Sequence, residues 1–260
     1  MSPIRGPNNE SYDEYFYKWS EEQQGLCKDL QAELNNEKRE EELQHIIEKV
    51  RQHYQEYYAA KGGAAKQDVL KMMQPSWRTP LENAFLWIGG WRPTMAFQLA
   101  YAQAGLQIEA ELAEFLSGLD TPSMASLSST QLSQISDLQV KTHKLEDELG
   151  HQQALVQQSL VDQPLLTLAQ ADQAGEVSDH SDTLSDAMDE KVKSLEELMS
   201  WADELRVETL EEFLRILTTV QAAQYLSAAG QIFVAMRKIG VKKEQESSLV
   251  NGQTQNGRSP

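Results

Sequence analysis

Residues 75–94 read PSWRTPLENAFLWIGGWRPT, and they carry the clearest helix start and stop signals in the chain. Thr79 is a good N-cap, a proline follows at the first helical position, and Glu82 completes a capping box three residues after the cap. Gly89-Gly90 is expected to close this helix, because glycine accepts the left-handed backbone that ends helices. Pro93 can then open another helix. The stretch therefore predicts two helices joined by a glycine turn.

Helical periodicity extends over almost the whole chain of 260 residues. Apolar residues recur at intervals of three and four, and no segment sustains the alternation of two that is typical of strands. The fold is therefore expected to be all-α, a multi-helix bundle with long antiparallel helices. The expected helices run over 11–34, 43–61, 69–73, 80–88, 93–105, 108–118, 128–163, 182–217 and 220–239.

The chain is expected to form one domain with unstructured ends. Glycines should end the second helix at Gly62-Gly63 and the last helix at Gly240. A polar segment at about 171–181 has few large apolar residues and is expected to be a flexible acidic linker inside the domain. The predicted parts are a disordered N-terminus, a helical domain and a disordered tail, over residues 1–9, 10–243 and 244–260.

Charge and composition exclude several classes of function. Forty acidic and 23 basic side chains give a formal net charge of −17, and residues 172–212 alone hold 14 acidic and 3 basic side chains. Such a chain repels a phosphate backbone and an anionic lipid surface, so no direct nucleic acid and no membrane partner is expected. Cys27 is the only cysteine, which excludes an internal disulfide, and the start of the chain lacks an apolar signal segment. We expect a protein of the nucleus or cytoplasm.

No motif of a catalytic or metal site is found along the sequence. P-loop, dinucleotide-binding, zinc-protease, nucleophile-elbow and EF-hand patterns are all missing. Two histidine pairs share helices, His45 with His53 and His143 with His151. Each pair lies eight residues apart, which does not give the i, i+4 geometry of a helical metal site. Neither an enzyme nor a metal centre is predicted.

Two aromatic clusters each allow two interpretations. Trp77, Trp87 and Trp91 lie within 15 residues, beside Arg78 and Arg92. These indoles either fill the core where helices meet, or line a pocket for a partner or an apolar ligand. The first helix is aromatic on nearly every side, through Tyr12, Tyr15, Phe16, Tyr17 and Trp19. It is either wedged between two other helices, or it presents a partner surface.

The last helix contains the sequence QIFVAMRKIGVKK at 231–243, in which apolar residues share one side with nearby lysine and arginine. The pattern is similar to a calmodulin target. The alternative is a terminal core helix whose basic residues suit the negative end of its dipole.

Three passages together resemble the plant Delay of Germination domain, which is also the C-terminal domain of TGA-type bZIP transcription factors. They are YDEYFYKWSEEQ at 12–23, FLWIGGWRPTMAFQL at 85–99 and ETLEEFLRILTTVQAAQYLSAAGQIF at 208–233. Their order and spacing agree over about residues 10–243. TGA factors carry a basic leucine zipper ahead of this domain, whereas about ten residues precede the first expected helix here. The chain therefore resembles the stand-alone branch, for which no direct DNA binding is expected.

The resemblance implies a non-enzymatic regulator of seed dormancy, germination, abscisic acid response or related plant development that acts through protein–protein interaction. Clade A protein phosphatases are the leading partners. The alternatives are a transcription cofactor that pairs with a TGA-type bZIP factor, or a sensor of haem or another small ligand, and homo-oligomerisation stays open.

The resemblance also assigns candidate residues. The first helix matches the family's partner-binding segment, so Tyr12, Phe16 and Trp19 are predicted to contact a partner. Some family members are associated with haem through histidines in the last helix, but residues 220–243 contain no histidine, so no haem is expected. Six residues form the family signature and a candidate pocket, namely Trp87, Gly89, Gly90, Trp91, Arg92 and Pro93.

Overall fold

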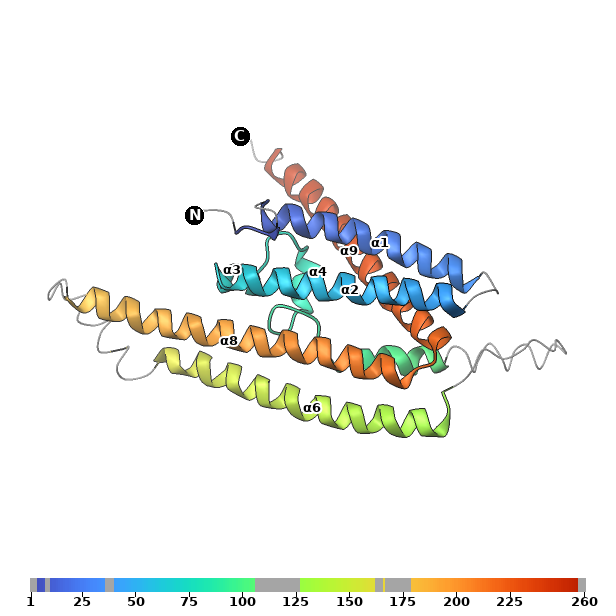
Figure 1. The fold of residues 1–260 in the computed structure, drawn as a ribbon. Coiled ribbons are helices and arrows are strands. Elements are labelled where there is room, and N and C mark those ends of the chain that lie inside the picture. The colour runs from blue at the N-terminus through green and yellow to red at the C-terminus, as the bar shows by residue number, and fades with distance from the viewer. Residues whose placement is uncertain are drawn as a thin grey trace.

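The computed structural model describes residues 4–7, 10–35, 40–105, 127–161, 166 and 179–256. The regular elements in these ranges are all helices, which confirms the predicted all-α class (Figure 1). They are α1 (Tyr12–Leu34), α2 (Glu40–Ala65), α3 (Val69–Met73), α4 (Pro80–Ala84), α6 (Ser129–Gln158), α8 (Asp179–Ile216) and α9 (Thr219–Asn256), with a 3₁₀ turn at Ser159–Val161 and a helical stretch at 95–105.

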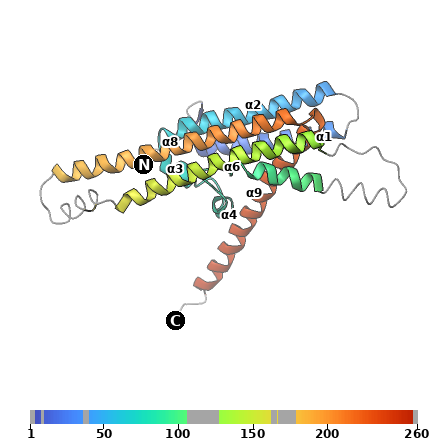
Figure 2. The same ribbon diagram turned by 90° about the horizontal axis from the view of Figure 1, so that it is seen from below.

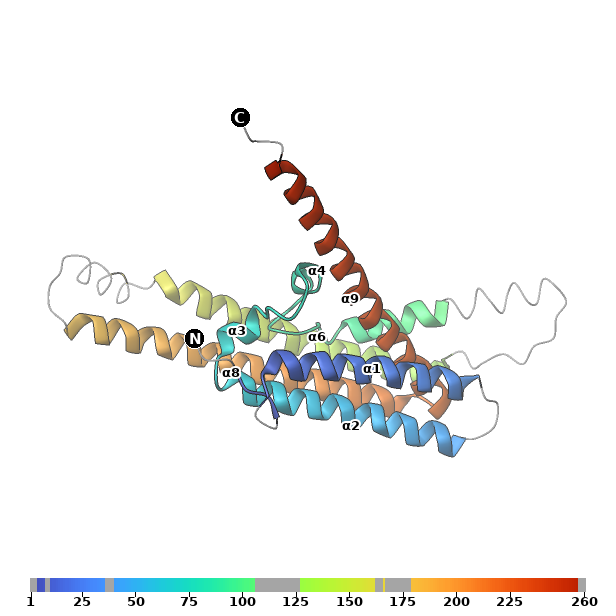
Figure 3. The same cartoon turned by 90° about the horizontal axis from the view of Figure 1, so that it is seen from above.

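Two antiparallel helix pairs build the bundle. α1 packs against α2, α6 packs against α8, and α8 also contacts α2 (Figure 1). α9 crosses the bundle obliquely and contacts α1, α2 and α4, and its C-terminal part extends beyond the other helices (Figures 2 and 3). The long antiparallel helices that the periodicity predicts are therefore present.

Capping boxes start three of the helices, at Ser11, Thr79 and Ser128. Each cap hydroxyl accepts a hydrogen bond from the backbone N–H three residues later, and the side chain at that later position accepts one from the N–H of the cap. A cap contributes about 1 kcal/mol of stability, so short-range sequence fixes these helix starts. All three starts agree with the prediction.

The buried apolar side chains form two clusters. One lies between the start of α1, the end of α2, α3 and the middle of α8, and the other lies between the end of α1, the start of α2, α6 and the junction of α8 with α9. Fully burying one large apolar side chain contributes about 1.5–3 kcal/mol. Members of the first cluster include Tyr12, Phe16, Trp19, Trp77 and Met199. Members of the second include Leu30, Val50, Phe97, Ile135 and Phe213.

The glycines that were predicted to end the second and last helices do not do so. α2 runs through Gly62-Gly63, because the buried side chains of Lys61 and Ala64 hold the helix on both sides of the pair. α9 runs through Gly240, where an added Cβ would lie 2.1 Å from the Oγ1 of Thr79. Gly240 therefore permits a close approach of α9 to α4 and does not terminate the helix.

The N-terminal segment also differs from the prediction of disorder. Ile4 is 3% exposed, and its carbonyl accepts a hydrogen bond of 2.9 Å from the N–H of Tyr12. Part of this segment therefore packs on the start of α1.

At the other end, α9 continues to Asn256, through much of the predicted tail. The i, i+4 ion pair of Lys242 with Glu246, at 3.8 Å, supports this extension, and the side chains at 241–247 are exposed. The expected helix at 108–118 and most of the expected linker, up to residue 178, lie outside the described residues.

Candidate functional site

A tight turn at residues 87–90 presents the predicted signature residues. The N–H of Trp87 donates to the carbonyl of Gly90 at 2.7 Å, and the N–H of Gly90 donates back to Trp87 at 3.1 Å. The two central residues both have positive φ, 45° at Ile88 and 66° at Gly89, as in a type I′ turn. α4 ends earlier than predicted, at Ala84, so the glycine pair shapes this turn and does not close the helix.

Arg206 of α8 holds the turn in place, although no sequence pattern indicated this residue. Its guanidinium donates to three backbone carbonyls of the turn region, those of Trp87, Ile88 and Trp91. An added Cβ on Gly90 would lie 2.7 Å from the Arg206 Cζ, so only glycine leaves room for this contact. The turn and α8 are therefore locked together through backbone atoms.

A buried ion cluster supports Arg206. Asp203 accepts hydrogen bonds from Arg206 and from Lys61, whose Nζ lies 2.7 Å from the carboxylate oxygen. Burial lowers the pKa of Lys61 to about 8, because desolvation outweighs the attraction of Asp203. The hydrogen bonds of this cluster connect α2 to α8 next to the turn.

Glu146 of α6 holds the far side of the same loop. It is fully buried and accepts hydrogen bonds from the N–H of Thr94 at 2.6 Å and from the Thr94 hydroxyl at 2.9 Å. The Arg92 Nε lies 4.0 Å from the same carboxylate. Residues on α6 and α8 thus set the position of a loop that precedes both helices in the chain.

An aromatic cavity of about 220 Å³ opens beside this loop. Gly90, Trp91, Arg92 and Pro93 of the predicted signature line the cavity, whereas Trp87 and Gly89 do not. The other walls include aromatic and cationic side chains from α1, α2, α8 and α9, among them Trp19, Tyr58, Lys61, Arg206, Tyr225 and Phe233. The arrangement suits a small apolar or aromatic ligand.

The lining of this cavity contains no histidine and no cysteine, whereas its tyrosines and Met95 belong to residue types that can also ligate haem iron. Over the described parts of the chain, no group of three or more His, Cys, Asp or Glu side chains is placed to hold a metal ion.

The structure corrects the predicted partner residues. Tyr12 and Phe16 are 0% exposed and Trp19 is 5% exposed. Tyr12 packs on Trp77 with ring centroids 4.9 Å apart, and Trp19 stacks on His53 at 4.9 Å. α2, α9 and the loop before α4 cover these rings, so they belong to the core and cannot form the predicted contact surface.

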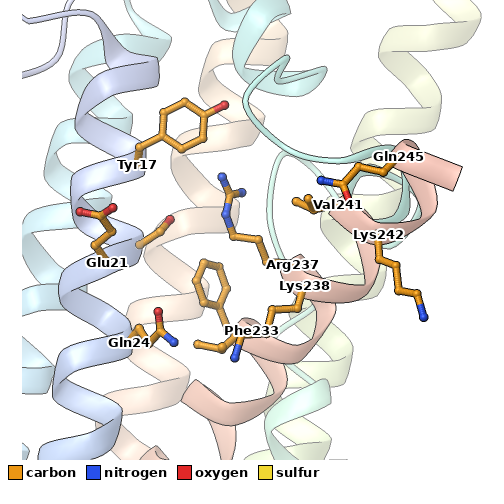
Figure 4. Close-up of a pocket in the computed structure, with 11 residues that line it drawn as sticks. Tyr17, Glu21, Gln24, Phe233, Arg237, Lys238, Val241, Lys242 and Gln245 are labelled. Atoms are coloured by element: carbon orange, nitrogen blue, oxygen red, sulfur yellow. The ribbon is translucent and has the colours of Figure 1, made fainter. Parts of the chain in front are cut away.

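An open groove lies on the other side of α1, between α1 and α9 (Figure 4). This α1–α9 groove has a volume of about 400 Å³. Arg237 lies between the two walls, with its Cζ 5.3 Å from the Phe16 ring and 5.1 Å from the Tyr17 ring. The groove is lined by Tyr17, Ser20, Glu21 and Gln24 of α1 and by Phe233, Val234, Arg237, Lys238, Val241, Lys242 and Gln245 of α9.

The family follows from comparison with known proteins. A family model described as DOG1, seed dormancy control, matches residues 26–102, which include α2 and the tight turn at residues 87–90 (the tryptophan turn). The chain carries a DOG1 domain. Protein DOG1-like 3 of Arabidopsis thaliana is 29% identical over 245 residues, which cover 90% of this chain and 86% of that relative. The predicted resemblance to the Delay of Germination domain is confirmed.

Transcription factors share the DOG1 region. The TGACG-sequence-specific DNA-binding protein TGA-2.1 of Nicotiana tabacum is 31% identical over 234 residues, 88% of this chain and 46% of that protein. Transcription factor HBP-1b(c38) of Triticum aestivum is 33% identical over 218 residues, 83% of this chain and 59% of that protein. The chain therefore spans about half the length of these factors.

The calmodulin-like segment at 231–243 is divided between core and solvent. Phe233 packs edge-on against Trp19 with centroids 5.4 Å apart, whereas Ile232 and Ile239 are 44% and 48% exposed. Calmodulin binding at 231–243 would have to displace the packed side or use the exposed one. Among the described helices, none combines the length and apolarity that a membrane crossing requires.

Proposed function

We propose that this protein is a non-enzymatic regulator that acts by binding other proteins, in the control of seed dormancy and germination or of a related abscisic acid response. The observation that carries the proposal is the α1–α9 groove, where Tyr17 and Val241 are 48% and 38% exposed beside three basic side chains. Exposed apolar surface rimmed by polar groups is typical of partner sites. The DOG1-like relatives support the process.

Clade A protein phosphatases are the leading partner class, and a TGA-type bZIP factor is the alternative. Similarity to DOG1-like proteins favours the first, and similarity to TGA factors over 88% of this chain favours the second. Either partner is compatible with action in the nucleus or cytoplasm. Self-association and calmodulin binding remain further proposals of the same class.

Affinity purification from seed tissue, followed by mass spectrometry, tests this function. The tagged protein is expected to enrich a phosphatase or a bZIP factor in near-stoichiometric amounts relative to a tag-only control. Failure to enrich any protein partner under these conditions would count against the proposed regulator.

A small-ligand sensor is the second candidate function, and the aromatic cavity favours it. Apolar and aromatic walls with a few convergent cations are the usual makeup of ligand pockets. Native mass spectrometry of protein purified from plant tissue should then show a bound small molecule that is lost when Ala229, which lines the cavity, is enlarged to Phe. Protein that is entirely free of ligand would remove this candidate.

A further inference from the structure

The shape of the α1–α9 groove limits what can bind there. Its α9 wall presents residues at spacings of four, Phe233, Arg237, Val241 and Gln245, over about three helical turns. Its α1 wall contributes about two turns. α9 crosses the bundle obliquely, so α1 and α9 diverge toward the C-terminal part of α9 (Figure 3). An occupant of about three turns would match it.

The walls favour a helical occupant over an extended one. Both are α-helices whose backbone groups are already hydrogen-bonded, so neither offers a free edge to an added strand. An extended peptide would also leave its own N–H and C=O groups against the rings of Tyr17 and Phe233. A helix satisfies these groups internally and presents only side chains.

The charges on α9 determine which charge a bound partner should carry. From Thr219 to Lys243, α9 contains four basic residues and no acidic residue, whereas the whole chain carries a net charge of −17. Lys238 lines the groove and has no ion-pair partner within the described part of the chain. Arg237 is held by the Trp77 carbonyl and by Glu82, and Lys242 turns away from α1 in Figure 4. Lys238 is therefore the cation available to a ligand.

We infer that the α1–α9 groove binds an acidic amphipathic helix of a partner protein, with its apolar side against Tyr17, Phe233 and Val241 and its acidic edge along Lys238. This inference rests on the proposed function and names the chemistry of the partner. Glu21 lines the opposite wall, so the two edges of the bound helix meet opposite charges. That asymmetry gives the helix one preferred direction in the groove.

The test uses two synthetic helices of about 15 residues, the length below which isolated helices are marginal. In both, leucine recurs at intervals of three and four. One carries glutamate on its polar face, and its twin carries lysine at the same positions. Fluorescence anisotropy measures their binding to the full chain, to Lys238→Glu, to Val241→Ser and to Lys243→Glu. The last variant makes the same charge change on α9 outside the groove.

The wild-type chain is expected to bind the glutamate helix at least about tenfold more tightly than the lysine twin. Lys238→Glu should weaken that binding about tenfold, Val241→Ser should weaken it as well, and Lys243→Glu should change it less than about twofold. Equal binding of the two helices by the wild-type chain, or equal effects of Lys238→Glu and Lys243→Glu, would overturn the inference. Circular dichroism verifies that each variant is folded.

The remaining outcomes separate this inference from the function on which it rests. If light scattering shows a dimer that Lys238→Glu dissociates and the glutamate helix cannot, the groove is an interface between copies and the inference is wrong. If the protein enriches a partner from seed tissue but does not bind the glutamate helix, the inference fails and the proposed regulator stands. If it enriches no partner, the proposed regulator fails whatever the peptides do.

Discussion

Replacing Gly90 with alanine tests the connection between the tryptophan turn and α8. The new Cβ would lie 2.7 Å from Cζ and 2.8 Å from Nε of Arg206, closer than real Cβ contacts allow, and 3.0 Å from Nη2. The guanidinium is the end of a flexible side chain, but here it is 5% exposed and bound to Asp203 and to the turn carbonyls. It cannot withdraw without breaking those bonds.

The expected loss follows from the number of bonds broken. A hydrogen bond from a charged donor contributes about 1.5–3 kcal/mol, and moving Arg206 away from the turn breaks at least one bond and leaves a buried carbonyl unsatisfied. Alanine stiffens the unfolded chain, which returns about 0.4–1 kcal/mol. The net loss in the free energy of unfolding should be about 2–4 kcal/mol. Valine at this position should be worse.

Urea denaturation followed by circular dichroism measures this loss. Gly63→Ala is the matched control, because Gly63 lies inside α2 with nothing within 4 Å of an added Cβ. This control should gain up to about 1 kcal/mol, since alanine is the better helix former. A Gly90→Ala variant within about 0.5 kcal/mol of the wild type would refute the proposed role of Arg206.

Three further predictions follow from the same contacts and charges. Phe16→Ala should lower the free energy of unfolding by about 3–5 kcal/mol in urea denaturation, because the ring is fully buried. The double change with Trp19→Ala should abolish the fold. A folded double mutant would contradict the assignment of these rings to the core. The pKa of Lys61 is about 8 in the folded chain and about 10.4 when unfolded, so the unfolded chain binds more protons between pH 8 and 10. The wild type should therefore gain stability relative to Lys61→Met over that interval, and a flat or falling difference would show that burial does not lower the pKa of Lys61. Finally, the net charge of −17 predicts no shift of duplex DNA at physiological salt in a gel assay, a view that salt-sensitive submicromolar binding would reverse.

Features that depend on neighbouring residues could be predicted from the sequence. The starts at Ser11, Thr79 and Ser128 are set within three residues, and α3 ends before Pro75 for an equally local reason. The break between α8 and α9 at residues 217–218 also agrees with the prediction. In each case the deciding hydrogen bonds or steric conflicts lie inside one turn of the chain.

Features that depend on distant residues could not be predicted in this way. The sequence singled out Gly90, but its partner Arg206 lies 116 positions later, and nothing in the spacing connects them. Glu146 and Lys61 look like ordinary helix residues until the fold buries them. Gly240 was predicted to end a helix because glycine often does so, and its close tertiary contact with Thr79 is not visible in the sequence.

The misassigned aromatic residues show a different limit. Tyr12, Phe16 and Trp19 follow the i, i+4, i+7 stripe that also contains the buried Gln23 and Leu30, so the pattern already favoured the core for these rings. The family resemblance favoured a partner surface instead. The surface that remains open on α1 is centred on Tyr17, outside that stripe.

The most direct test of the account compares partner capture by the wild-type chain with capture by Lys238→Glu and Lys243→Glu, from the same seed extract and with quantitative mass spectrometry. The account predicts that wild type and Lys243→Glu enrich the same protein equally, and that Lys238→Glu, folded to the same extent, enriches it about tenfold less. Equal enrichment by all three chains would contradict the role of the groove, and no enrichment by any of them would contradict a regulator that works by binding proteins.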